Sequence, residues 1–159
     1  MMKKSQAIKP ILDEIRKIRF FDEYDERQLI TIAGISSIKE FKVKEILFEQ
    51  YDELTELYIL IKGTLSLGIS LPNEKRIYLG TIEEGELFSW SAVFSPYIST
   101  AWVKALTPGK VIAVDSKNLN LEFTKDCEFG LKTMSKIAQT ISRRLTDTRF
   151  HLINLLTIT

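Results

Sequence analysis

The feature that most restricts the fold of this 159-residue chain is a change in the spacing of its apolar residues. Up to Gly34 they recur at helical intervals. From about residue 37 to residue 116 they fall in short runs that are rich in β-branched and aromatic residues. Turn signals such as Gly63 and Leu71–Glu74 separate these runs. Short strands at this spacing predict a β-sandwich or an antiparallel barrel.

Helical patterns stand on both sides of the central region. Residues 6–18 carry apolar side chains at helical spacing. A second helix is expected to begin at Asp25, which forms a capping box with Gln28, and to stop at Gly34. From about Phe129 the pattern predicts one long helix to the end of the chain. Helices on both sides of a β region predict an α+β fold.

The composition fits one domain and excludes several classes of protein. The chain is 45% hydrophobic and 27% charged, as is typical of globular proteins. Its net charge of +1 gives no overall electrostatic attraction to nucleic acid or to a membrane. No apolar run reaches the ~18 residues of a membrane span, and no signal peptide follows the N-terminal lysines. The single cysteine, Cys127, excludes an internal disulfide. We therefore expect a cytoplasmic protein that by itself binds neither membrane nor nucleic acid.

The expected organisation is a single domain over residues 1–159. It divides into N-terminal helices at 1–36, a β-barrel at 37–116 and C-terminal helices at 117–159. The chain has one histidine, His151, and no Ser/His/Asp or Cys/His grouping, so we expect neither a metal site nor an enzyme.

The C-terminal helix carries apolar residues at heptad spacing. A seam with alternating steps of four and three residues runs through Met134, Ala138, Ile141, Leu145, Thr148, Leu152 and Leu155. A second apolar side contains Ile137, Phe150, Ile153 and Leu156. Two apolar sides predict two partners, the chain's own barrel and a second copy in a parallel homodimer. The alternative is that both sides pack within one chain.

Three arginines interleave with this seam. Arg143, Arg144 and Arg149 lie on a helix that also holds Asp147. We interpret them as a solvated or interhelical flank rather than as a nucleic-acid stripe.

Two segments of the central region carry a more specific pattern. The first runs from Phe41 to Asp52 and is followed by Leu57-Tyr-Ile-Leu-Ile-Lys-Gly-Thr-Leu-Ser-Leu67. The second is Gly85-Glu-Leu-Phe88 leading to Ser99-Thr-Ala-Trp-Val-Lys-Ala105. Together they resemble the cyclic-nucleotide-binding domain of catabolite-activator-type regulators, and the likeness covers about residues 20–157.

The resemblance implies a jelly-roll-like antiparallel barrel with N-terminal helices and a long C-terminal dimerisation helix. In that family a phosphate-binding cassette and this helix hold a cyclic nucleotide between them. Backbone N–H groups and an arginine bind the cyclic phosphate, and a glutamate accepts from the ribose hydroxyl.

The chain departs from the family where the ligand would bind. Ser89 and Trp90 stand where the family has Gly-Glu, and Ser99 stands where it has the arginine. Lys44 and Tyr51 also replace family glycines, which we interpret as turn geometry. Loss of an arginine–phosphate contact removes about 1.5–3 kcal/mol, so tight binding of cyclic AMP is disfavoured.

The candidate ligand-binding residues are those of this degenerate cassette: Gly85, Leu87, Phe88, Ser89, Trp90, Ser91, Ser99 and Thr100. We expect no cofactor. The predicted function is a non-enzymatic regulatory or sensor module that binds cyclic AMP weakly or not at all and takes another small ligand or none. The alternative is the sensory half of a catabolite-activator-type transcription regulator whose DNA-binding domain is absent from this chain.

Overall fold

The computed structural model describes residues 2–157, with side chains from residue 7 onward. The helices are α1 (Met2–Ile15), α2 (Glu26–Gly34), α3 (Ser116–Lys125) and α4 (Cys127–Thr157), with short 3₁₀ turns η1 (Arg19–Phe21) and η2 (Trp90–Ala92). The strands are β1 (Ser36–Phe41), β2 (Ile46–Phe48), β3 (Glu56–Lys62), β4 (Leu65–Ser70), β5 (Arg76–Ile82), β6 (Leu87–Phe88), β7 (Trp102–Ala105) and β8 (Gly109–Asp115). Residues 1, 158 and 159, which we included in the predicted domain, lie outside the described part.

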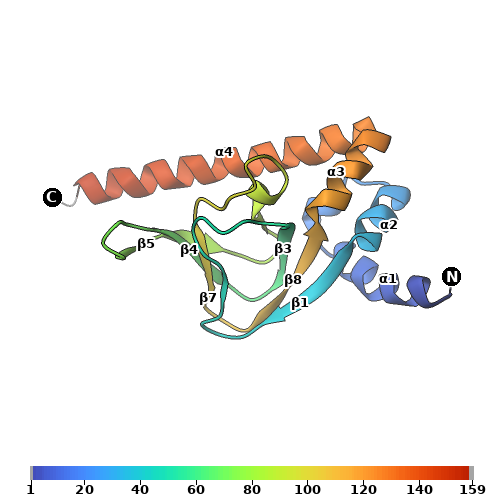
Figure 1. The fold of residues 1–159 in the computed structure, drawn as a ribbon, viewed down its shortest axis with the longest axis horizontal. Helices are drawn as coiled ribbons and strands as arrows, with labels where there is room; N and C mark the ends of the chain where they lie inside the picture. The colour runs from blue at the N-terminus through green and yellow to red at the C-terminus, as the bar shows by residue number, and fades with distance from the viewer. Residues whose placement is uncertain (1, 158–159) are drawn as a thin grey trace.

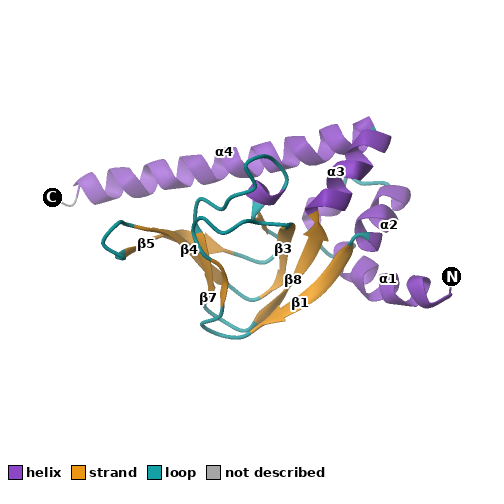
Figure 2. Ribbon diagram, viewed as in Figure 1, coloured by secondary structure: helices purple, strands orange, loops and turns teal. Residues whose placement is uncertain are grey.

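The strands form two four-stranded antiparallel sheets, in the orders β1-β8-β3-β6 and β2-β7-β4-β5. Helix α4 runs along one side of the barrel, while α1, α2 and α3 gather at the end where α4 begins (Figure 1). Figure 2 shows the same division between the strands and the surrounding helices. The predicted α+β fold with a jelly-roll-like antiparallel barrel is confirmed.

The first sheet is covered on both faces. Leu57 and Ile59 of β3 pack with Ile112 of β8 in a core shared with the helices. The alternate residues Leu60 and Val111 point into a second core between the two sheets. Because successive side chains of a strand point to opposite faces, burial of both faces explains the nearly continuous apolar run in β3.

Local signals in the sequence mark the ends of the helices. Asp25 caps α2, and the reciprocal bonds between Asp25 and Gln28 form the predicted capping box. Asp115 caps α3 by accepting from the backbone N–H of Asn118 at 2.7 Å. Each cap satisfies a backbone N–H that would otherwise lack a partner at the start of a helix.

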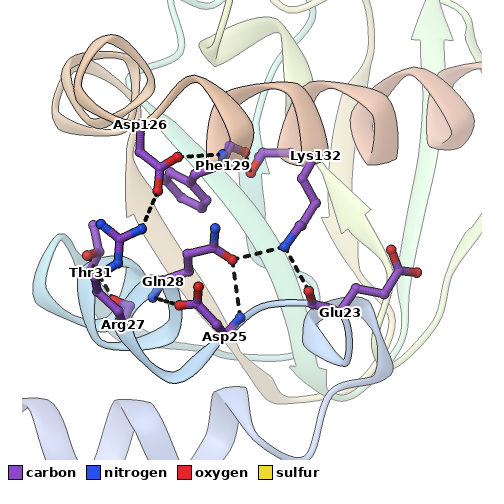
Figure 3. A network of polar contacts seen from close by, with 9 residues as sticks. Glu23, Asp25, Arg27, Gln28, Thr31, Asp126, Phe129 and Lys132 are labelled. Carbon is purple, nitrogen blue, oxygen red and sulfur yellow. Dashed lines mark hydrogen bonds and ion pairs between the residues drawn. The ribbon is translucent and has the colours of Figure 1, made fainter.

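A polar network fixes α4 to α2 at the start of the long helix (Figure 3). Arg27 donates to the Asp126 carboxylate at 2.8 Å, and the backbone N–H of Phe129 donates to the same carboxylate at 3.0 Å. The Phe129 bond is the main reason that the pKa of Asp126 lies below its ordinary value, and the Arg27 charge adds to it. Lys132 reaches back to the buried Gln28 amide at 3.0 Å.

Candidate functional site

The degenerate cassette lines a small, partly open cavity of about 30 Å³ between β6, the start of β7 and helix α4. Thirteen residues line it: Phe48, Leu54, Leu67, Ile82, Phe88, Ser89, Trp90, Ser91, Ser99, Thr100, Ala101, Val103 and Arg144. One water molecule occupies about 30 Å³ of liquid, whereas small-molecule sites generally measure roughly 300–1,000 Å³. The cavity is therefore much smaller than a typical small-molecule site.

Ser89 takes the backbone shape of the glycine that it replaces. Its φ is 58°, in the left-handed region where glycine is favoured. Its hydroxyl accepts from the backbone N–H of Tyr58 at 2.9 Å and donates to the carbonyl of Glu56 at 2.9 Å. Ser89 thus uses its hydroxyl to tie the cassette to β3, and that hydroxyl is already engaged within the chain.

Lys44 and Tyr51 show the same pattern, with φ of 69° and 75°. Their interpretation as turn geometry agrees with these left-handed conformations. The turn at Tyr51 also supports the cassette, because its backbone N–H donates to the Ser99 carbonyl at 2.8 Å.

Ser99 occupies the position where the resemblance implies the phosphate-binding arginine. It is buried, and its hydroxyl donates to the carbonyl of Ala101 at 2.6 Å while accepting from the backbone N–H of the same residue. The neighbouring Thr100 is exposed at the edge of the cavity. The barrel therefore contributes hydroxyls at this point and no positive charge.

Trp90 opens the turn η2 and is partly buried. Its ring packs against the core shared with the helices and also lines the cavity. An indole buries up to about 200 Å² of apolar surface, so Trp90 fills space in the part of the cassette where the family places a carboxylate.

Two of the predicted site residues lie outside the cavity. Leu87 points into the core shared with the helices. Gly85 lies in the turn before β6 and lines a separate surface groove beside α4. The other six, Phe88, Ser89, Trp90, Ser91, Ser99 and Thr100, come together around the cavity.

Arg144 is the residue that sequence reasoning missed. Its side chain is only 14% exposed, and its Nη1 donates to the carbonyl of Thr81 in β5 at 3.1 Å. Its Nη2 lies 3.9 Å from the Glu86 carboxylate, which also accepts from Arg143 at 3.0 Å. Arg144 is therefore not solvated as one half of the interpretation expected, and the other half, an interhelical flank, stays a prediction. Its spacing of seven residues from Ile137, which is buried against the barrel, was the available signal.

The predicted seam on α4 is largely exposed in the single chain. Met134, Leu145, Leu152 and Leu155 are each at least one-third exposed, and Ile141 is partly buried against the barrel. The residues of the second apolar side differ in their burial. Ile137 is buried, whereas Phe150 and Ile153 are exposed near the end of the helix.

Over residues 2–157, no group of three or more His, Cys, Asp or Glu side chains could hold a metal ion. None of the helices in this part of the chain has the length and apolarity needed to cross a membrane.

The fold is a helix-covered antiparallel barrel with a short cassette between β6 and β7. The sequence profile described as "Cyclic nucleotide-binding domain" matches residues 38–126, more than half of the chain. The chain therefore belongs to the cyclic nucleotide-binding domain family, and the resemblance read from the sequence is confirmed.

Individual relatives agree with this assignment. The cAMP-activated global transcriptional regulator CRP of Pasteurella multocida is 23% identical over 119 residues, which are 74% of this chain and 55% of the relative. The chain thus spans about half the length of that regulator.

Solved structures show the same fold. A cyclic nucleotide-binding domain from Methylobacillus flagellatus matches with a TM-score of 0.77 at 14% identity, over 94% of this chain and 84% of that one. The N-terminal domain of a transcriptional regulator from Streptomyces coelicolor matches with a TM-score of 0.67 at 22% identity, over 82% and 93%.

Proposed function

We propose that this protein is a non-enzymatic regulatory module that forms a homodimer through α4 and whose cassette does not hold cyclic AMP tightly. The observation that carries the proposal is the small size and the lining of the cassette cavity. Its cavity of about 30 Å³ is lined by Trp90 and Ser99 where the family has a carboxylate and a guanidinium. The proposal also allows the same cassette to bind a different small ligand if the cavity widens.

The charges around the cavity support weak binding of cyclic nucleotides. Among the described residues that line it, Arg144 is the only charged one, and it is already bonded to the Thr81 carbonyl and close to Glu86. A charge-assisted contact to a phosphate contributes about 1.5–3 kcal/mol, or roughly ten- to a hundredfold in affinity. A nucleotide would have to displace these contacts of Arg144 to recover that energy.

The surface of α4 supports the homodimer. Its exposed leucines follow heptad spacing along a helix of 31 residues, which is the pattern of a two-stranded coiled coil. Apolar side chains gathered along one line in this way generally mark an interaction surface.

Native mass spectrometry of the purified protein tests both parts. We expect the mass of two 18.3 kDa chains with no nucleotide retained. A monomer at micromolar concentration, or a mass increment equal to a cyclic nucleotide, would contradict the proposal.

A second candidate is the sensory half of a catabolite-activator-type transcription regulator. It is favoured by the Pasteurella regulator, of which this chain spans about half. In that case this polypeptide alone should not retain duplex DNA in a mobility-shift assay at physiological salt. Retention would show that the DNA-reading function lies within these 159 residues.

A further inference from the structure

Glu86 connects the turn before the cassette to helix α4. Its carboxylate accepts from Arg143 at 3.0 Å and lies 3.9 Å from Arg144. The same carboxylate accepts from the backbone N–H of Glu83 at 2.8 Å, which holds the turn 83–86 in shape. One acidic side chain therefore links this turn to two arginines of the long helix.

The heptad pattern shows where these arginines would lie in a parallel homodimer. With Ala138, Leu145 and Leu152 at the a positions, Arg144 occupies a g position and Arg149 occupies the following e position. In a parallel coiled coil a g residue faces the e residue five positions later in the other helix. Arg144 of one copy would therefore face Arg149 of the second copy.

Two facing arginines oppose association, because like charges at paired positions are destabilising. In the described structure Arg149 is exposed, whereas Arg144 is drawn back onto the barrel by Thr81 and Glu86. Arg143 lies at an f position, on the side of the helix away from the seam. The charge that matters for dimerisation is thus the one on Arg144.

We propose that Glu86 controls the strength of the homodimer by neutralising Arg144 at its edge. The inference rests on the proposed dimerisation through α4 and adds a way in which the cassette regulates it. The turn 83–86 leads directly into Leu87 and Phe88 of β6 and then into the cassette. A change at the cassette that moves this turn withdraws the carboxylate, exposes Arg144 to the second copy's Arg149 and weakens the dimer.

The experiment compares dimer dissociation constants by sedimentation equilibrium for the wild type, Glu86→Gln and Glu84→Gln. Glu86→Gln keeps the shape of the side chain and removes its charge. Glu84→Gln removes the same charge from the same turn, but Glu84 contacts the backbone N–H of Gly63 rather than an arginine. We expect Glu86→Gln to weaken the dimer by roughly threefold to tenfold, from two symmetric pairs of surface charges, and Glu84→Gln to leave it unchanged.

A second background isolates the partner contact. In an Arg149→Ser protein no arginine faces Arg144, so adding Glu86→Gln should no longer weaken the dimer. Equal dissociation constants for Glu86→Gln and Glu84→Gln, or an undiminished effect of Glu86→Gln in the Arg149→Ser background, would overturn the inference while leaving dimerisation standing. A wild type that is monomeric would instead refute the dimer itself.

Discussion

Replacing Leu145 by aspartate should separate the homodimer. Leu145 lies in the middle of the predicted seam and is 49% exposed in the single chain, so about half of its side chain remains to be buried by a partner. Full burial of a leucine contributes about 1.5–3 kcal/mol. Half of that from each of two copies gives about 2 kcal/mol for the dimer. Leu145→Asp removes this contribution and also desolvates two facing carboxylates.

The dimer dissociation constant should therefore rise by at least roughly thirtyfold, measured by sedimentation equilibrium over a range of concentrations. Phe150→Asp is the matched control, because Phe150 is 62% exposed on the same helix but lies away from the seam. Circular dichroism checks that both variants keep their helices. A Leu145→Asp protein that dimerises like the wild type, or a Phe150→Asp protein that dissociates equally, would refute the assignment of the seam.

Two further predictions concern the stability of the fold. In Gly68→Ala the new Cβ would lie 2.1 Å from the Ile77 carbonyl oxygen and 2.3 Å from the Trp102 ring, so urea unfolding should show a loss of about 1–3 kcal/mol. Gly34→Ala, whose nearest atom would be 3.9 Å away, should show no such loss. Burial raises the pKa of Tyr24 to about 12 and its hydroxyl bonds Thr133, so stability should be fully present below pH ~10 and fall between pH ~10 and ~12. Tyr24→Phe should flatten that alkaline decline in urea titrations, and an equally steep decline in the variant would contradict the burial effect.

Features set by neighbouring residues were predictable from the sequence. The capping box of Asp25 and Gln28 depends on a spacing of three residues, and the structure contains it. The left-handed turns at Lys44 and Tyr51 were recognisable because the family that the chain resembles has glycine at these positions. Such features depend on backbone geometry within a few residues, which the order of side chains largely determines.

The state of the site was less predictable, because it depends on contacts between distant segments. The bonds of the Ser89 hydroxyl to β3 require the pairing of residues 31 and 33 positions apart. Arg144 lies 63 residues from its Thr81 partner. Its place beside Arg143, on a helix that also holds Asp147, led to its interpretation as a solvated or interhelical flank. Long arginine side chains bury their stems when an acceptor is within reach, and only the packed barrel shows that acceptor.

The central proposal is that the family's fold is retained while Trp90 and Ser99 replace the carboxylate and guanidinium of its nucleotide site. Calorimetric titration of the wild-type protein with cyclic AMP and with cyclic GMP tests it most directly. The small cavity of about 30 Å³ and its lining by Trp90 and Ser99 predict no binding tighter than the high-micromolar range for either nucleotide. A sub-micromolar dissociation constant for either one would show that these two residues do not disable the site.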